Sequence, residues 1–299
     1  MKMRSYIKGC CKMKKRTCGK IVTEGDELFY KVTGNGVPLI LISGGGGDGD
    51  TFLPLADEMS NQFKVITFDR RANARSTANN MENFSVAQQS RDVLAVIGAV
   101  GEESAFVFGN SSGGVIALEL VQNFPEVVRL AVIHEPPLAN FANDQERWLK
   151  FFDDCYQLAL CKDSNKAATK FGMGVMGRKT IAPLLSDIRL KAYLRKEPKL
   201  TGEVRIPERI ADDIFIKQEL IPVTNYIPNM DILREHKEKL IFAAGDWSVN
   251  KNVWFAEVAQ KLSNEIGSTL ITLPGSHVSF MDKPKEWARV LSACYNKPQ

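Results

Sequence analysis

The chain has 299 residues, of which 44% are hydrophobic and 25% are charged, as is ordinary for a globular protein. No apolar run approaches the roughly 18 residues needed to cross a membrane, and the basic N-terminus lacks the apolar segment of a secretory signal. These features argue against a membrane-spanning protein and predict a cytoplasmic one, with one large domain or a domain that carries an insertion.

The net charge of +4 is concentrated at the N-terminus, where residues 1–20 hold eight Lys or Arg and no acidic residue. The remainder of the chain is mildly acidic. A basic segment of this kind can contact nucleic acid or a membrane surface. We interpret residues 1–19 instead as a solvated terminal tail, and expect no nucleic-acid partner.

The cysteines give no sign of a metal site or a disulfide framework. They show no CxxC pair, and no histidine flanks them at the spacing of zinc ligands. We expect ordinary reduced thiols and no bound metal. The six are Cys10, Cys11, Cys18, Cys155, Cys161 and Cys294.

Short apolar runs alternate with longer amphipathic segments, a pattern that predicts βα units and a mostly parallel sheet flanked by helices. The first two strands are expected as a hairpin over residues 20–33, turning at Glu24-Gly25-Asp26. Further strands are predicted at 38–43, 63–68, 105–108, 130–133, 240–244 and 269–272, and helices at 51–60, 85–99, 112–123, 252–262 and 284–295.

The alternation stops between residues 138 and 238, where helical patterns and proline stops occur without a convincing strand. We therefore expect a core made of residues 20–137 and 239–299, with a helical cap over 138–238. An aromatic stripe at helical spacing in this cap is more typical of packing than of a substrate pocket. Its members are Trp148, Phe151, Phe152 and Tyr156.

The pentapeptide Gly109-Asn110-Ser111-Ser112-Gly113 has the form GxSxG. The pattern alone is weak, but here it directly follows a predicted strand and directly precedes a predicted helix, as a nucleophile elbow requires. A serine on so sharp a turn has a strained backbone, and glycines two residues before and after it leave room for neighbouring segments. The sequence therefore predicts that Ser111 is a nucleophile.

In this motif and in the order of its elements, the chain from about Lys20 onward resembles the α/β-hydrolase superfamily. The resemblance implies a histidine base on the loop after the last strand, which here is His277 in Gly275-Ser276-His277. The other two histidines fit less well. His236 lies in a charged helical segment, and His134, at the end of a strand, is expected to be structural.

The resemblance also implies two backbone N–H groups that stabilise an oxyanion. One is that of Ser112, directly after the nucleophile, and the other belongs to the loop Gly44-Gly45-Gly46-Gly47, most simply Gly45. No Gly-Lys-Ser/Thr follows these glycines, so a phosphate-binding loop is excluded. Asp69-Arg70-Arg71 occupies a loop where relatives have Asp-x-Arg-Gly, and its charges are expected to brace neighbouring loops.

Two residues compete for the triad acid. Relatives carry it after the strand that follows the cap, where this chain has Asp246 followed by Trp247 and Ser248. Other relatives place it after the preceding strand, where Glu135 stands. Glu135 is the first choice and Asp246 the alternative.

The resemblance implies a serine hydrolase that cleaves a small or medium carboxylic ester, or a related acyl bond of a small molecule, through an acyl-enzyme on Ser111. A carbon–carbon bond hydrolase or a perhydrolase would use the same residues. A protein of another class, a non-catalytic receptor for a small ligand on this fold, would be favoured by loss of the serine or the histidine. No metal or organic cofactor is implied.

Overall fold

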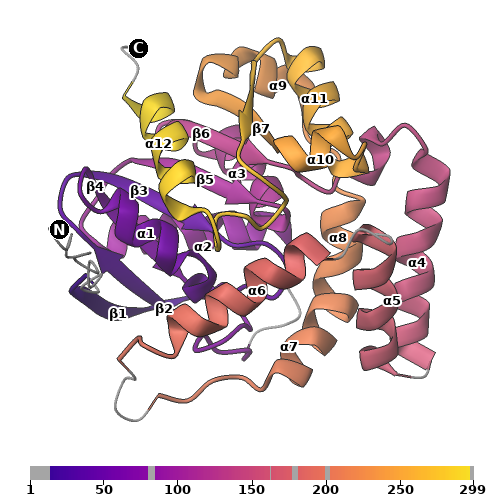
Figure 1. Ribbon diagram of the computed structural model, residues 1–299, viewed down its shortest axis with the longest axis horizontal. Helices are drawn as coiled ribbons and strands as arrows, with labels where there is room; N and C mark the ends of the chain where they lie inside the picture. Colours follow the sequence, from indigo (N-terminus) through magenta and orange to yellow (C-terminus); the bar gives the residue numbers. More distant parts are fainter. Residues whose placement is uncertain (1–13, 80–84, 162, 177–180, 199–202, 297–299) are drawn as a thin grey trace, which may run out of the picture.

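The computed structural model describes residues 14–79, 85–161, 163–176, 181–198 and 203–296. Cys10 and Cys11 and most of the predicted basic tail lie outside these residues. The described chain forms one eight-stranded sheet with helices on both faces, and a group of helices inserted between the sixth and seventh strands (Figure 1). No helix among the described residues is both long and apolar enough to cross a membrane.

The sheet is antiparallel at one edge and parallel over the rest of its width, as the sequence predicts. Its strand order is β1-β2-β4-β3-β5-β6-β7-β8, and only the pairs β1–β2 and β2–β4 are antiparallel. The strands are β1 (Arg16–Thr23), β2 (Asp26–Thr33), β3 (Val37–Ile42), β4 (Phe63–Phe68), β5 (Ala105–Asn110), β6 (Val128–His134), β7 (Leu240–Gly245) and β8 (Thr269–Leu273).

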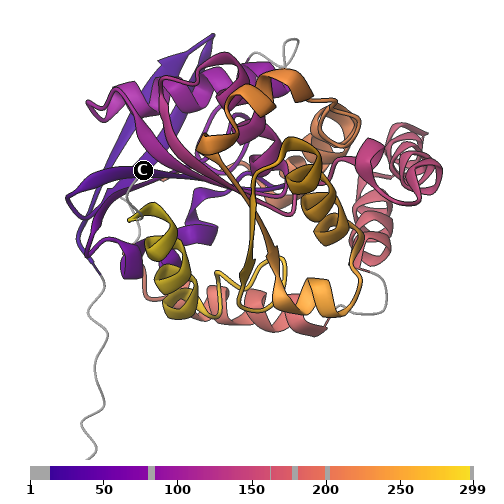
Figure 2. The same ribbon diagram turned by 90° about the horizontal axis from the view of Figure 1, so that it is seen from above.

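Two helical layers bury the sheet, which explains the continuous apolar run of β3. Successive side chains of a strand point to opposite faces. Ile40 and Ile42 therefore pack with α2 (Val86–Ala99), α3 (Ser112–Asn123) and α11 (Trp254–Ile266). Leu39 and Leu41 pack on the other face with α1 (Leu53–Met59) and α12 (Pro284–Tyr295). Figure 2 shows the two layers on either side of the sheet.

The first hairpin begins earlier than predicted. β1 starts at Arg16 rather than Lys20, so the strand includes the end of the basic segment. The physical reason is that the Arg16 guanidinium is paired and nearly buried. It bonds Asp57 at 2.7 Å, Tyr193 at 2.8 Å and Glu197 at 2.9 Å. These partners are 41 to 181 residues away in the sequence, so local composition could not reveal them.

Between β6 and β7 the described residues contain helices and no strand, as predicted. The α-helices of this helical insertion are α4 (Gln145–Cys161), α5 (Ser164–Met176), α6 (Ile181–Leu194), α7 (Glu208–Ile214), α8 (Leu220–Thr224) and α9 (Met230–Glu235). A π-helical segment, η3 (Phe215–Glu219), joins α7 to α8. Short 3-10 turns lie at Ala139–Phe141 and Lys237–Lys239, another at Gly49–Phe52 before α1, and the short helix α10 (Asp246–Asn250) follows β7.

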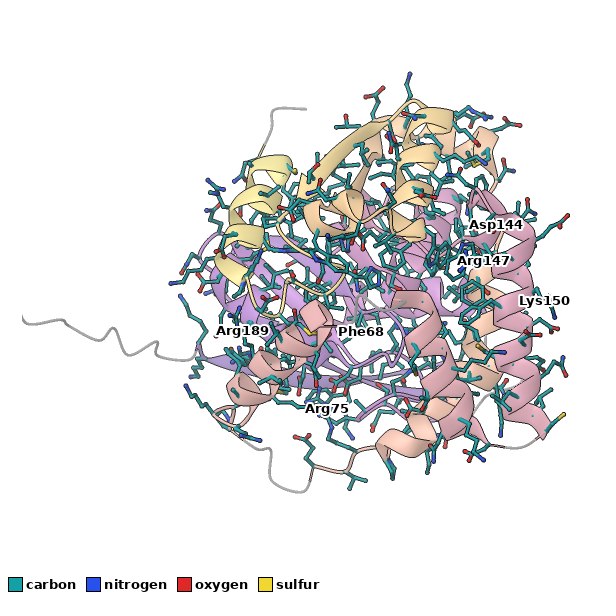
Figure 3. All side chains as sticks on the ribbon, turned by 45° about the vertical axis from the view of Figure 1, so that its right-hand side comes forward. Phe68, Arg75, Asp144, Arg147, Lys150 and Arg189 are labelled. Atoms are coloured by element: carbon teal, nitrogen blue, oxygen red, sulfur yellow. The ribbon has the colours of Figure 1, made fainter. Side chains whose placement is uncertain are left out.

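The aromatic stripe of α4 packs inward, which confirms the prediction. Trp148 and Phe152 are buried, and the Trp148 ring stacks on Trp254 of α11 with the ring centres 4.5 Å apart. The opposite side of this helix is charged: Arg147 and Lys150 point outward in Figure 3. The helix is thus an amphipathic element fixed to the core by its apolar face.

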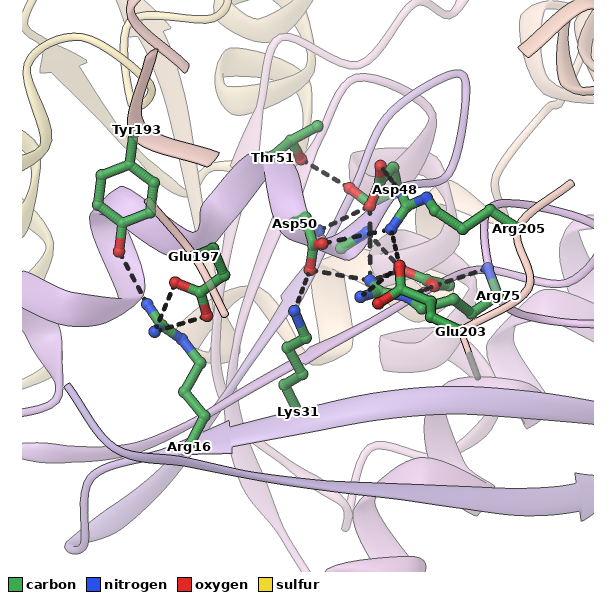
Figure 4. A network of polar contacts seen from close by, with 12 residues as sticks. Arg16, Lys31, Asp48, Asp50, Thr51, Arg75, Tyr193, Glu197, Glu203 and Arg205 are labelled. Atoms are coloured by element: carbon green, nitrogen blue, oxygen red, sulfur yellow. Dashed lines mark hydrogen bonds and ion pairs between the residues drawn. The ribbon is translucent and has the colours of Figure 1, made fainter. Parts of the chain in front are cut away.

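A polar network ties the helical insertion to the loop after β3 and to the sheet edge (Figure 4). The Asp50 carboxylate forms ion pairs with Lys31 of β2 and with Arg75, each at 2.8 Å. Arg205, from the segment before α7, pairs with Asp48 and lies 3.4 Å from Asp50. The insertion is therefore held to the core by charge as well as by apolar packing.

Candidate active site

Ser111 lies between β5 and α3, as predicted, and its backbone is strained. Its φ of 56° and ψ of −122° lie in a region that residues with a β-carbon rarely adopt. A β-carbon on Gly113 would lie 2.1 Å from the Ile42 carbonyl oxygen, and one on Gly109 would lie 2.3 Å from the Gly113 oxygen. Both positions therefore require glycine, for the reason that the sequence suggested.

His277 lies on the loop between β8 and α12 and contacts Glu135, the first residue after β6. Its Nδ1 is 2.6 Å from Glu135 Oε2. The other carboxylate oxygen accepts a hydrogen bond from the Gly245 backbone N–H at 2.9 Å. Glu135 is fully buried and, like Ser111, has a positive φ, here 47°. The residue whose carboxylate contacts the histidine thus has a strained backbone, as the elbow serine does.

Burial alone would raise the pKa of Glu135. The contacts with His134 and His277 and the bond from Gly245 outweigh burial, so that its pKa lies below the ordinary value. The carboxylate is therefore ionised at neutral pH. An anion beside Nδ1 fixes which ring nitrogen carries the proton and leaves Nε2 of His277 for another partner.

Asp246, the second candidate acid, has a different partner. Its Oδ1 accepts a hydrogen bond from the Gly275 backbone N–H at 2.7 Å, and the Trp247 N–H bonds the Gly275 carbonyl at 3.0 Å. Asp246 therefore braces the loop that carries His277, two residues before the histidine. Of the two candidates, the structure brings Glu135 to His277.

His134 lies closer to these groups than the sequence suggested. It is fully buried, its Nδ1 is 2.6 Å from Asn110 Oδ1, and its carbonyl accepts the Ser111 N–H at 2.9 Å. Its ring stacks on that of His277 with the centres 5.7 Å apart. Burial lowers its pKa to about 4, so it is neutral at pH 7. It links the elbow to the His277–Glu135 pair. His134 reaches this position because it pairs with Asn110 at the ends of the neighbouring strands β6 and β5.

His134, Glu135 and His277 offer atoms within 4.8 Å of one another, as a set of metal ligands would. However, the 2.6 Å contact between His277 Nδ1 and Glu135 Oε2 already uses one ligand atom of each.

The glycine loop lies directly against Ser111. A β-carbon on Gly44 would be 2.9 Å from the Ser111 β-carbon. The Gly47 N–H donates to the Gly44 carbonyl at 3.0 Å, which closes a tight turn with Gly45 and Gly46 at its tip. Ser112 is the first residue of α3, where backbone N–H groups have no partner within the helix. The two predicted donors therefore lie on the two segments next to the serine.

Two surface hollows lie elsewhere. One of about 340 Å³ is lined by residues of α5 and α7, including Asp213, together with Asp163, which directly precedes α5. Another of about 650 Å³ is lined by residues of the β1–β2 hairpin together with Lys64 and Val100. None of their lining residues is a predicted site residue.

A mostly parallel sheet, a strained serine at a strand-to-helix turn and a histidine–carboxylate pair at the neighbouring strand ends define the α/β-hydrolase fold. The family described as alpha/beta hydrolase fold matches residues 37–175. The described chain therefore has the α/β-hydrolase fold.

Individual proteins are similar to this chain over different lengths. The uncharacterized hydrolase YraK of Bacillus subtilis is 28% identical over 280 residues, 91% of this chain and 94% of that protein. The zearalenone hydrolase of Cladophialophora bantiana is 35% identical over 129 residues, 42% of this chain and 49% of that protein. Among solved structures, Est816, titled an N-acyl homoserine lactone degrading enzyme, superposes with a TM-score of 0.68 at 20% identity, covering 92% of this chain and 99% of its own.

Proposed function

We propose that this protein is a serine hydrolase that cleaves a small or medium carboxylic ester, or a related acyl bond, through an acyl-enzyme on Ser111. The observation that carries the proposal is the strained Ser111 at the elbow, joined through His134 to the His277–Glu135 pair. A serine hydroxyl is a weak nucleophile unless a positioned base takes its proton, and this arrangement supports such a base.

In the proposed mechanism, the Ser111 oxygen attacks the substrate carbonyl carbon while its proton passes to Nε2 of His277. His277 then gives this proton to the leaving alkoxide, and the C–O bond of the ester breaks. Water attacks the acyl-enzyme with the same histidine as base, which releases the acid and restores Ser111. Glu135 orients the imidazole and stabilises its charged form, and the N–H groups of Ser112 and Gly45 bind the oxyanion.

The names of similar proteins support an acyl bond as the target. Two of them are a zearalenone hydrolase and an N-acyl homoserine lactone degrading enzyme. A third is a putative carbamate hydrolase, RutD of Azorhizobium caulinodans, which is 33% identical over 107 residues. The chain keeps a serine, a histidine and a carboxylate in contact with that histidine, which favours an enzyme over a non-catalytic receptor. We propose that residues 138–238 act as a cap that shapes the acyl-binding side.

Hydrolysis of p-nitrophenyl acetate, butyrate and octanoate tests the proposal. The native protein is expected to turn over at least one of them, and Ser111→Ala to lose about 10⁴-fold or more in kcat/KM. Ser112→Ala is the matched control, because it removes a neighbouring hydroxyl and keeps the backbone N–H. Equal activity of native protein and Ser111→Ala would contradict the proposal.

A further inference from the structure

Arg70, the second residue after β4, is 1% exposed and reaches the glycine loop. Its Nη2 donates to the Gly44 carbonyl oxygen at 2.5 Å. Its own backbone N–H donates to the Gly47 carbonyl at 2.8 Å. Side chain and backbone of one residue thus hold both ends of the turn that contains Gly45.

The Gly44 carbonyl and the Gly45 N–H belong to the same peptide unit. That unit is planar and trans, so its C=O and N–H point in opposite directions. A guanidinium on the carbonyl therefore fixes the direction of the N–H on the other side. A charged donor on the carbonyl also polarises the unit and strengthens the N–H as a donor. Among the described residues, no acceptor takes the Gly45 N–H.

Arg70 is held in place by the helical insertion. Glu219 is also 1% exposed, and its carboxylate accepts hydrogen bonds from Arg70 Nη2 at 2.8 Å and Nη1 at 2.9 Å. This bidentate pairing fixes the plane of the guanidinium. Gln89 of α2 accepts a further bond from Nη1. The carboxylate that neutralises Arg70 thus comes from a residue 149 positions away.

Glu219 ends the π-helical segment η3, and Phe215 begins it. A β-carbon on Gly45 would lie 2.6 Å from the Phe215 ring, so this ring lies directly against Gly45. The segment η3 therefore contacts the glycine loop in two ways: Glu219 pairs with Arg70, which bonds the loop, and the Phe215 ring packs against Gly45. Single-turn π segments are frequent at functional sites.

The neighbouring arginines, Arg71 and Arg75, bind other partners. Arg71 binds Asp26 at 2.6 Å and Asp92 at 2.6 Å, which ties the first hairpin to α2. Arg75 binds Asp69 and Asp50. Arg71 and Arg75 are thus buried and paired like Arg70, whereas only Arg70 bonds a carbonyl of the glycine loop.

We propose that Arg70 is a positioning residue for the oxyanion hole: it orients the Gly45 N–H through the Gly44 carbonyl and is itself held by Glu219 of the insertion. The inference rests on the proposed serine-hydrolase function and deepens it. It means that the insertion helps to assemble the catalytic site and does more than cover it.

The test compares Arg70→Met, Arg70→Lys, Glu219→Gln and the control Arg71→Lys. The readouts are kcat and KM for p-nitrophenyl butyrate, and the affinity of an alkyl trifluoromethyl ketone, whose adduct with serine carries an oxyanion. Arg70→Met is expected to lower kcat by about tenfold to a hundredfold, with KM changed less than about threefold, and to weaken the ketone by the same factor as kcat. Arg70→Lys keeps a charged donor and is expected to recover much of the loss.

A purely structural role would change thermal stability without this pattern, as Arg71→Lys is expected to do. Because truncating one member of a buried ion pair can prevent folding, Glu219→Gln provides the test if Arg70→Met does not fold. Glu219→Gln is then expected to lower kcat and ketone affinity together, by a smaller factor than Arg70→Met. A folded Arg70→Met or Glu219→Gln variant whose kcat and ketone affinity match the native protein would overturn the inference.

Labelling of the native protein by a fluorophosphonate at Ser111 separates this outcome from failure of the proposed function. If the native protein labels and the Arg70 and Glu219 variants behave like it, only the positioning role is wrong. If the native protein neither labels nor hydrolyses an ester, both proposals are wrong.

Discussion

The two sides of Ser111 are built in different ways. On the side of the proposed base, called the base side below, Glu135 and His277 follow the ends of β6 and β8, and strand neighbours and one 2.6 Å contact hold them. On the side of the proposed oxyanion hole, called the oxyanion side below, the loop Gly44–Gly47 is held by Arg70, whose partner Glu219 comes from the insertion. The base side therefore belongs to the sheet, while the oxyanion side depends on a segment far away in the sequence.

The largest effect is expected on the base side, from Glu135→Gln. The amide keeps the size of the side chain but cannot stabilise a charged His277, so kcat/KM for p-nitrophenyl butyrate is expected to fall by about 10³- to 10⁴-fold. Asp246→Asn is the matched control. Its amide oxygen can still accept the Gly275 N–H, so the loss is expected to stay below about tenfold. The reverse order would make Asp246 the acid.

The buried neutral His134 should make the stability of the base side depend on pH. Burial lowers its pKa from 6.5 to about 4, so the unfolded chain binds a proton between these values and the folded protein does not. The contribution of His134 to the free energy of unfolding is therefore full above pH 6.5 and falls as the pH approaches 4, by up to about 3 kcal/mol. Urea unfolding between pH 5 and 7 measures the slope.

His134→Asn is the matched variant for this measurement, because its amide can still donate to Asn110. The contribution of Glu135, whose pKa is lowered from 4.5, acts mainly below that value. Asp48 and Asp92, whose pKa values are raised to about 6, titrate within the window and oppose the slope from His134. Because both aspartates are present in the variant too, the difference between the two slopes isolates His134. An unchanged pH slope in the variant would show that His134 is not the group responsible.

A smaller effect is expected from Gly45→Ala on the oxyanion side. The added methyl would meet the Phe215 ring and displace either the ring or the loop, with an expected loss of about tenfold in kcat. Phe215→Ala in the same chain removes the clash, so the double variant should regain activity relative to Gly45→Ala. Losses that simply multiply would show that the ring does not press on the loop.

The smallest effect is expected at the outer attachment of the insertion. Tyr193→Phe removes the hydroxyl that bonds Arg16 at 2.8 Å and Asp57 at 2.5 Å. Thermal or urea unfolding should show a loss of about 1 kcal/mol, with kcat and KM unchanged. A change in kcat would mean that the outer attachment also influences the oxyanion side.

Much of the base side could be predicted from the sequence. The strand-to-helix elbow around Ser111 has local signals in glycine spacing and apolar periodicity, and both flanking elements occur where they were expected. His277 followed from the resemblance to α/β hydrolases, which place the base on the loop after the last strand. The alternation of apolar runs with amphipathic segments predicted the mostly parallel sheet flanked by helices.

The choice between Glu135 and Asp246 could not be made from the sequence with the same ease. Both residues directly follow adjacent parallel strands, so spacing places them at one edge of the sheet. The difference lies in tertiary detail: the positive φ of Glu135, and the close approach of Gly245 to Gly275, which gives Asp246 its own partner.

The role proposed for Arg70 was also out of reach. The sequence suggested that the charges of Asp69-Arg70-Arg71 brace loops, and the structure shows which loop each arginine contacts. The pairing of Arg70 with Glu219 spans 149 residues and leaves no local pattern. Contacts of this kind depend on how the insertion packs, which a single sequence does not specify.

Intact-mass analysis after treatment with a fluorophosphonate tests the central claim most directly, because this probe reacts with an activated serine whatever the natural substrate is. We predict one adduct per native chain, none on Ser111→Ala, and far slower labelling of Glu135→Gln. Native protein that folds and stays unlabelled, or labelling that persists in Ser111→Ala, would contradict the account.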